Sequence, residues 1–205
     1  AIVPAILEAW YPGQAGGQAI ADILFGDYNP SGRLPVTFYQ SVEQLPPFND
    51  YSMSGRTYRY FRQEPLYEFG HGMSYSKFEY SNLNLPGEIH AGEDLNLSIN
   101  ITNKGPYDGD EVVQVYLSHP DFPEGPIRSL QAFTRIFIQS GQTKTVHFRL
   151  EPEHMAIYHP EHKLIVPEGR LQVSVGGSQP NETALKNNLV LSKEANIRGS
   201  HTVIW

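Results

Sequence analysis

Apolar and polar residues alternate in several short stretches of the second half of the chain. Between Asp94 and Asn103 every second residue is leucine or isoleucine, and Val146, Phe148 and Leu150 alternate with polar residues in the same way. Alternation with a period of two predicts strands that bury only one face. The same pattern predicts further strands at Phe78 and Tyr80 and over residues 112–117, 133–138, 157–158, 164–166 and 171–175.

Turn-forming residues separate these stretches at roughly ten-residue intervals. Examples are NKGPYDGD at 103–110, HPDFPEGP at 119–126 and SGQT at 140–143. About seven short strands with this spacing are typical of an immunoglobulin-like or fibronectin type III-like β-sandwich. We therefore predict a mainly β fold. Residues 179–205 are less regular, which fits either a last strand or a tail that packs on a neighbouring molecule.

The first part of the chain follows a different rhythm. Glycines between Pro12 and Gly17 allow a tight loop, and Ala19, Ile20, Ile23 and Leu24 follow at helical spacing. This pattern predicts a short amphipathic helix. Glycine accepts the left-handed conformation that ends many helices, so the helix should stop at Gly26. A turn at 29–32 and a strand at 36–38 are predicted next.

Three blocks in this region carry a family resemblance. WYPGQAGGQAIADILFGDYNPSGRLPVTF at 10–38, GRTYRYF at 55–61 and PLYEFGHGMSY at 65–75 closely resemble the C-terminal half of glycoside hydrolase family 3. AIVPAILEAW at 1–10 resembles a late strand of that family's α/β sandwich domain. The resemblance implies that residues 1–75 are the C-terminal end of the α/β sandwich domain plus a linker. Residues 76–205 would be a fibronectin type III-like β-sandwich with a C-terminal extension.

The resemblance also implies an activity for a parent protein. Family members remove terminal β-linked glucose or xylose by a retaining mechanism that needs two carboxylates. The nucleophile belongs to an N-terminal barrel and the acid/base to an upstream part of the sandwich, and neither motif is visible here. We therefore expect a scaffold that is inactive alone, with the barrel and the rest of the sandwich as its partners. The motifs are closer to the β-xylosidase-type branch.

We assign no catalytic, cofactor-binding or metal-binding residue. The acidic residues of the first part match no catalytic position of the family; these are Glu8, Asp22, Asp27, Asp50, Glu64 and Glu68. If any segment borders a sugar site, it is the loop PPFNDYSMSGRTYRYF, with Tyr51, Arg56 and Tyr58 as contributors. We favour the alternative, in which Arg56 and Arg59 brace the contact between the two parts of the chain, because arginine often anchors interfaces.

Other site chemistries are weakly supported. His154, His159 and His162 could be imagined as zinc ligands, but their proline-rich surroundings favour a solvated turn. The glycines near Gln14 lack the lysine and the Ser or Thr of a phosphate-binding loop. We therefore expect no cofactor.

Charge and composition exclude other functions. A net charge of −7 argues against a nucleic-acid partner. No apolar run is long enough for a membrane span. The absence of cysteine excludes disulfides and thiolate metal sites. We expect a secreted or periplasmic protein. Three sequons occur, at Asn96, Asn100 and Asn181, and we regard them as chance matches.

Two rival functions remain open. One is a non-catalytic β-sandwich module for carbohydrate binding or protein interaction, because a fold alone does not define a function. Against a free module stand residues 10–75, which would expose apolar strand edges without a partner. The other is a homo-oligomer formed through the tail at 179–205.

Overall fold

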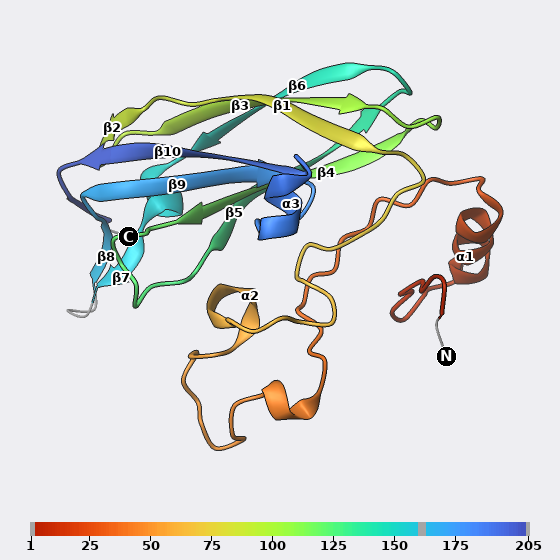
Figure 1. Ribbon diagram of the computed structural model, residues 1–205, viewed down its shortest axis with the longest axis horizontal. Coiled ribbons are helices and arrows are strands. Elements are labelled where there is room, and N and C mark those ends of the chain that lie inside the picture. Colours follow the sequence, from red (N-terminus) through yellow and green to blue (C-terminus); the bar gives the residue numbers. More distant parts are fainter. Residues whose placement is uncertain (1–2, 160–162, 204–205) are drawn as a thin grey trace.

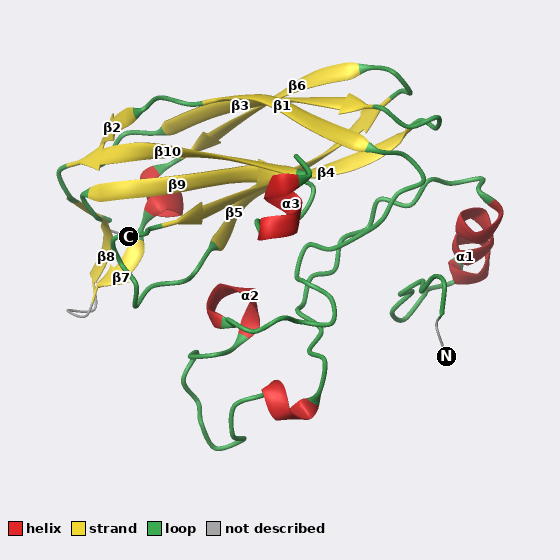
Figure 2. Cartoon of the chain, in the orientation of Figure 1, coloured by secondary structure: helices red, strands yellow, loops and turns green. Residues whose placement is uncertain are grey.

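The computed structural model describes residues 3–159 and 163–203 and shows a β-sandwich preceded by a long segment with little regular structure (Figures 1 and 2). The short helical elements are α1 (Gly16–Phe25), η1 (Val42–Gln44), α2 (Thr57–Tyr60), η2 (Pro152–Met155) and α3 (Glu182–Lys186). The strands are β1 (Phe78–Asn84), β2 (Glu88–His90), β3 (Leu95–Asn103), β4 (Gly109–Ser118), β5 (Ser129–Ile138), β6 (Thr143–Leu150), β7 (Ile157–His159), β8 (Lys163–Val166), β9 (Gly169–Gly176), β10 (Val190–Arg198) and β11 (His201–Thr202).

The strands form two facing layers and a small end sheet. One layer has the antiparallel order β1-β3-β6, and the other has the order β2-β10-β9-β4-β5. In the five-stranded layer only the pair of β2 and β10 is parallel. Figure 1 shows the two layers one above the other, with β7 and β8 at one end. The mainly β fold and the β-sandwich predicted from the alternating pattern are confirmed.

The core lies between the two layers, where the alternating apolar residues meet. Leu95, Ile99 and Ile101 of β3 are fully buried, as are Val113 and Val115 of β4. Burying each such side chain stabilises the fold by about 1.5–3 kcal/mol. The intervening residues of β3 point outward, as the alternation predicts.

The tail of the chain supplies a strand of the larger sheet. β10 pairs with β9 along its length, from Val190 to Ile197, and with β2 on its other side. Ala195 and Ile197 of this strand are buried in the core. Of the two alternatives left open for residues 179–205, the last strand is therefore the correct one.

In the first part of the chain the predicted helix forms, but the predicted strands do not form as expected. α1 ends where Gly26 adopts a left-handed φ of 84°. The strand predicted at 36–38 is wrong in extent, because only Phe38 forms an isolated bridge, to Tyr67. No strand forms over residues 3–10. A strand needs a neighbour along its length to receive its hydrogen bonds. Residues 3–10 have none among the described residues, and at 36–38 only Phe38 has one, which is Tyr67.

Many apolar side chains of this first part face solvent. α1 has no buried residue, and its apolar residues Leu24 and Phe25 are 66% and 83% exposed. Phe48, in the loop after η1, is 95% exposed. Large apolar side chains exposed at several places are typical of surface that another part of a protein covers.

Candidate functional site

A buried ion pair joins the first part of the chain to the sandwich. Nη2 of Arg33 lies 2.6 Å from Oε2 of Glu111 on β4, and the side chains are only 11% and 3% exposed. The Tyr80 hydroxyl on β1 donates to the other carboxylate oxygen at 2.5 Å. Arg33 also donates from Nε to the Gly177 carbonyl at 3.0 Å. Every polar atom of the carboxylate is thus paired, as a buried charge requires.

Burial governs the electrostatics of this junction. Desolvation raises the pKa of Glu111, although Arg33 and the hydrogen bond from Tyr80 lower it. Desolvation also raises the pKa of the Tyr80 hydroxyl well above its ordinary range, with the Glu111 charge adding to the effect. A catalytic acid needs a raised pKa and access to substrate. Glu111 has the first property but not the second, so its role is structural.

A second set of polar contacts extends the junction along the outer face of β4. Nε2 of Gln114 donates to the Gly70 carbonyl at 3.2 Å and to the Gly177 carbonyl at 2.9 Å. The Tyr116 hydroxyl donates to Oε1 of Gln114 at 2.6 Å. Gly70 has a φ of 78°, and a Cβ there would lie 2.4 Å from Oε1 of Gln114. The close approach of the two parts therefore requires glycine at this position.

Four carboxylates of the first part make structural contacts. Asp50 accepts from the Ser52 amide at 2.8 Å, and this hydrogen bond lowers the pKa of Asp50. Oε2 of Glu68 accepts from the Asn181 side chain at 2.8 Å. Glu8 accepts from the amide of Trp10, and Asp22 from the side chain of Gln18. These contacts give Asp50, Glu8 and Asp22 a local structural role, whereas Glu68 links the first part of the chain to α3.

The loop at 46–61 does not make the arginine side-chain contacts between the two parts of the chain that the sequence favoured. Arg56 donates to the carbonyls of Ser52 at 3.0 Å and Asp50 at 2.5 Å, so it stabilises its own loop. Tyr58 contacts the sandwich instead: its hydroxyl accepts from the Leu130 amide at 3.0 Å. The prediction that Arg56 braces the two parts is therefore wrong, and Arg33 and Tyr58 perform this role. Tyr51 is 88% exposed.

Arg59 reaches the sandwich through its backbone rather than its guanidinium. Its carbonyl accepts from the Ile127 amide at 2.7 Å. The guanidinium lies over the Tyr60 ring, 5.9 Å from the centroid. The side chain is exposed and contributes to a pocket described below.

The histidine-rich turn shows no metal geometry in the part of the chain that the structure describes. Nδ1 of His154 accepts from the Glu151 amide at 3.1 Å and caps η2. His159 ends β7, and His162 lies outside the described residues. The contact of His154 with the Glu151 amide is therefore explained by its structural role in this turn.

The three sequons have different surroundings. Asn96 and Asn100 lie on the outward face of β3 rather than the inward face. Asn181 caps α3, since its Oδ1 accepts from the Ala184 amide at 2.7 Å. A glycan on Asn181 would be attached to Nδ2, the atom that donates to Oε2 of Glu68, so it would disturb that contact rather than the cap.

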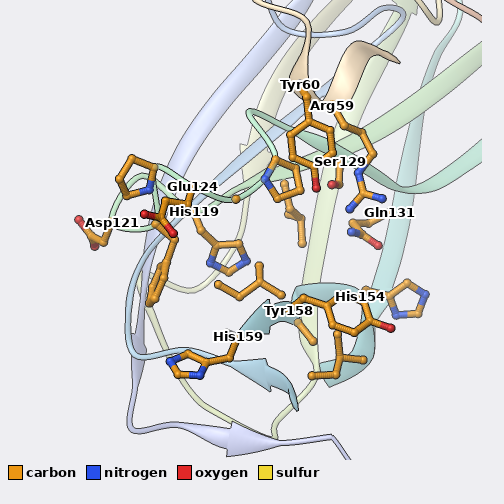
Figure 3. A pocket seen from close by; sticks show the side chains of 18 of the residues that line it. Arg59, Tyr60, His119, Asp121, Glu124, Ser129, Gln131, His154, Tyr158 and His159 are labelled. Carbon is orange, nitrogen blue, oxygen red and sulfur yellow. The ribbon is translucent and has the colours of Figure 1, made fainter. Parts of the chain in front are cut away.

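A hollow lies where α2 meets the sandwich (Figure 3). It has a volume of about 770 Å³. Arg59 and Tyr60 come from α2, Ser129 and Gln131 from β5, and Tyr158 from β7. Figure 3 shows the first four grouped on one side, with Tyr158 across the hollow. We call this hollow the α2 pocket. Its size is in the range of small-ligand sites.

Sequence reasoning missed both the junction and the α2 pocket. Arg33 lies in the turn between Gly32 and Leu34, where nothing marks it as the partner of an acid 78 positions later. Glu111 gave a better signal, because it stands at an inward position of an apolar strand, and a charge there needs a partner. The α2 pocket combines residues from distant segments, which no local motif reveals.

Family comparisons define the class of the chain. Residues 1–75 match the model described as "Glycosyl hydrolase family 3 C-terminal domain", and residues 111–179 match that of the "Fibronectin type III-like domain". These matches cover the two parts that the junction joins. The chain belongs to glycoside hydrolase family 3 and carries its C-terminal region.

Individual relatives agree with this assignment. The chain is 41% identical, over 91% of its length, to a xylan 1,4-beta-xylosidase of Xylanibacter ruminicola and covers 22% of that protein. It is 37% identical, over 84% of its length, to a periplasmic beta-glucosidase of Salmonella typhimurium and covers 24% of it. The chain thus spans about a quarter of the length of the curated relatives it matches.

Solved structures show the same fold. The beta-glucosidase 3B of Thermotoga neapolitana, in complex with alpha-D-glucose, superposes with a TM-score of 0.82 at 31% identity, covering 95% of this chain and 28% of that one. A beta-glucosidase of Listeria innocua, in complex with glucose, gives a TM-score of 0.77 at 33% identity, covering 94% and 28%. The fold of the first part and of the sandwich is therefore that of family 3 β-glucosidases.

Proposed function

We propose that this chain is the scaffold region of an exo-acting, retaining glycoside hydrolase that releases terminal β-linked glucose or xylose. The observation that carries the proposal is the junction, in which Arg33 of the family 3 segment is locked to Glu111 and Gly177 of the sandwich. A rigid connection of this kind lets the sandwich hold the preceding domain in a fixed orientation. The catalytic pair belongs to the remainder of the parent protein, and no residue of this chain is assigned to it.

The exposed apolar surface of residues 3–75 supports a larger parent. Trp10, Leu24 and Phe25 are 53%, 66% and 83% exposed in the described structure. The remaining barrel and α/β sandwich would bury these side chains and complete the sheet to which residues 1–10 and 36–38 belong. This also explains why the segment does not form strands here.

Glucose and xylose stay as alternatives for the released sugar, because the names of the relatives include both. We further propose that the parent is exported to the periplasm or the medium, since one relative is named as periplasmic. No described helix has the length and apolarity needed to cross a membrane.

We place the boundary between the two parts at residues 75 and 76. The family 3 match extends over residues 1–75, and β1 begins shortly afterwards at Phe78. The sandwich module accordingly covers residues 76–205. The junction contacts of Arg33 and Gly70 cross this boundary.

The proposal is tested on the full-length parent protein. We expect it to hydrolyse aryl β-xylosides or aryl β-glucosides, and proton NMR of the first product should show the β-anomer, because a retaining mechanism preserves configuration. Initial release of the α-anomer, or no hydrolysis of either substrate by a folded parent, would contradict the proposed reaction.

A further inference from the structure

The α2 pocket contains polar side chains whose hydrogen-bonding capacity is not used. Ser129 is only 8% exposed and opens onto the pocket. Within the described residues, the side chains of Ser129 and Gln131 and the hydroxyl of Tyr60 have no hydrogen-bond partner. These three groups come from two elements and lie on the same side of the pocket (Figure 3). Partly buried polar groups of this kind are ready to bind a polar ligand.

The opposite side of the pocket presents an aromatic ring. Tyr158 is 81% exposed, although it lies on a strand beside the core. Phe122 contributes a second ring, packed against His119 with centroids 6.3 Å apart. Because the Tyr158 ring is largely exposed, it contributes little to the packing of the core. An exposed aromatic face opposite hydrogen-bonding groups suits a ligand that is apolar on one face and polar at its edges.

The charges around the pocket disfavour an anionic ligand. Asp121 is neutralised by Arg170, whose Nη2 and Nε lie 2.7 Å and 3.0 Å from Oδ1. The remaining charged lining residues are Arg59, Glu124 and Glu153. Burial lowers the pKa of His119, which favours its neutral form. The lining is therefore slightly negative and offers both donors and acceptors.

The position of α2 is fixed by contacts on both sides. Thr57 has a φ of 54°, a conformation that costs a β-branched residue roughly 1–3 kcal/mol. Its amide donates to the Tyr39 hydroxyl at 3.1 Å. The next residue, Tyr58, stacks on Phe69 with centroids 4.1 Å apart. Because Tyr58 is anchored by this stacking, α2 is held in place, and Tyr60 in the same helix stays at the pocket.

We propose that the α2 pocket is a binding site for a neutral oligosaccharide, in which the Tyr158 ring stacks on a sugar ring and Ser129, Gln131 and Tyr60 bind its hydroxyl groups. Sugar hydroxyls donate and accept, which matches the mixed lining. The site would hold a glycan on the sandwich. The choice of a glycan as ligand rests on the proposed function.

The test is a titration of this chain, labelled with ¹⁵N, with xylotetraose and cellotetraose. We expect fast-exchange shifts of the backbone amides of β5, β7 and the 119–126 loop, and a dissociation constant at or below roughly 1 mM. Tetragalacturonate, an anionic tetrasaccharide, should bind more weakly than either neutral one.

Two variants, Tyr158→Ala and Gln131→Ala, locate the site, and a third variant is their control. Tyr158→Ala should weaken binding about tenfold, because the stacking ring is lost. Tyr107→Ala is the matched control: Tyr107 is 59% exposed in the β3–β4 turn and does not line the pocket, so binding should be unchanged. Gln131→Ala should also weaken binding, and thermal unfolding establishes that each variant is folded.

No shifts with either neutral tetrasaccharide at about 10 mM, shifts outside the pocket, or unchanged binding by folded Tyr158→Ala would each overturn the proposal. These results would leave the proposed hydrolase reaction intact, because the titration involves no turnover. Conversely, a parent without glycosidase activity would refute the proposed reaction while binding by this chain could still be measured.

Discussion

Arg33→Leu is the substitution that most directly perturbs the junction. The leucine keeps only the inner, apolar part of the arginine side chain and removes the ion pair at 2.6 Å and the hydrogen bond to the Gly177 carbonyl. Gln114 still donates to this carbonyl at 2.9 Å, so the carbonyl keeps a partner. The main cost is therefore the uncompensated charge of Glu111.

The magnitude follows from the burial of the pair. Removing one partner of a buried ion pair costs about 3–5 kcal/mol, because the other charge stays desolvated. One kcal/mol changes the Tm of a domain of this size by about 3–4 °C, so we expect a Tm about 9–20 °C lower. The loss should be largest where Glu111 is ionised.

The pH dependence gives a sharper test. Burial raises the pKa of Glu111 above its ordinary value of 4.5 in the folded chain. A raised carboxyl pKa contributes stability below 4.5 that is lost as the pH rises through the folded pKa. Without Arg33 the folded pKa rises further, so this window extends upward. The Tm deficit of Arg33→Leu should therefore be greater at pH 8 than at pH 5.

The assay is thermal unfolding followed by circular dichroism at both pH values. Adding Glu111→Gln to Arg33→Leu should abolish the extra loss at pH 8, since no charge remains. Arg149→Leu is the control, because its ion pair with Asp94 lies at the surface and should contribute little. A Tm deficit for Arg33→Leu equal to that of the control, or one independent of pH, would refute the reasoning.

Three further predictions concern other contacts. Asn181→Ala removes the cap of α3 and the bond to Glu68 and should cost about 1 kcal/mol, measured by urea unfolding; an unchanged midpoint would refute a stabilising cap. Tyr58→Phe leaves the Leu130 amide without its partner and should cost about 1 kcal/mol in the same assay, and equal stability would contradict this. Removing residues 190–205 deletes β10 and exposes the edge of β9, so circular dichroism should show loss of the native fold, whereas retained native unfolding would show that β10 is dispensable.

The sandwich could be predicted from the sequence because its strands carry their own signal. The alternation over 94–103 reflects burial on one face, and β3 forms over Leu95–Asn103. The family blocks at 10–38 and 65–75 predicted the class that the comparisons found. The end of α1 at Gly26 could also be predicted, because it depends on the residues next to it in the sequence.

Features that depend on distant residues could not be predicted. The weak alternation of residues 179–205 did not show whether β10 would lie inside the sheet, since this depends on pairing with β9. The strand expected at 1–10 has no pairing partner in the described part of that range, residues 3–10, and at 36–38 only Phe38 pairs, with Tyr67. The partner of Arg33 depends on how the two parts pack, so sequence favoured Arg56, which in fact bonds its own loop.

The most direct test of the scaffold account is the activity of this chain by itself. The purified chain is assayed on aryl β-xylosides and aryl β-glucosides, after circular dichroism has established that it is folded. The account predicts no release of the aryl group above the buffer rate, because a retaining glycosidase needs two carboxylates and the account assigns both to the remainder of the parent. Hydrolysis that co-purifies with the chain and disappears in Asp50→Asn or Glu68→Gln would contradict it.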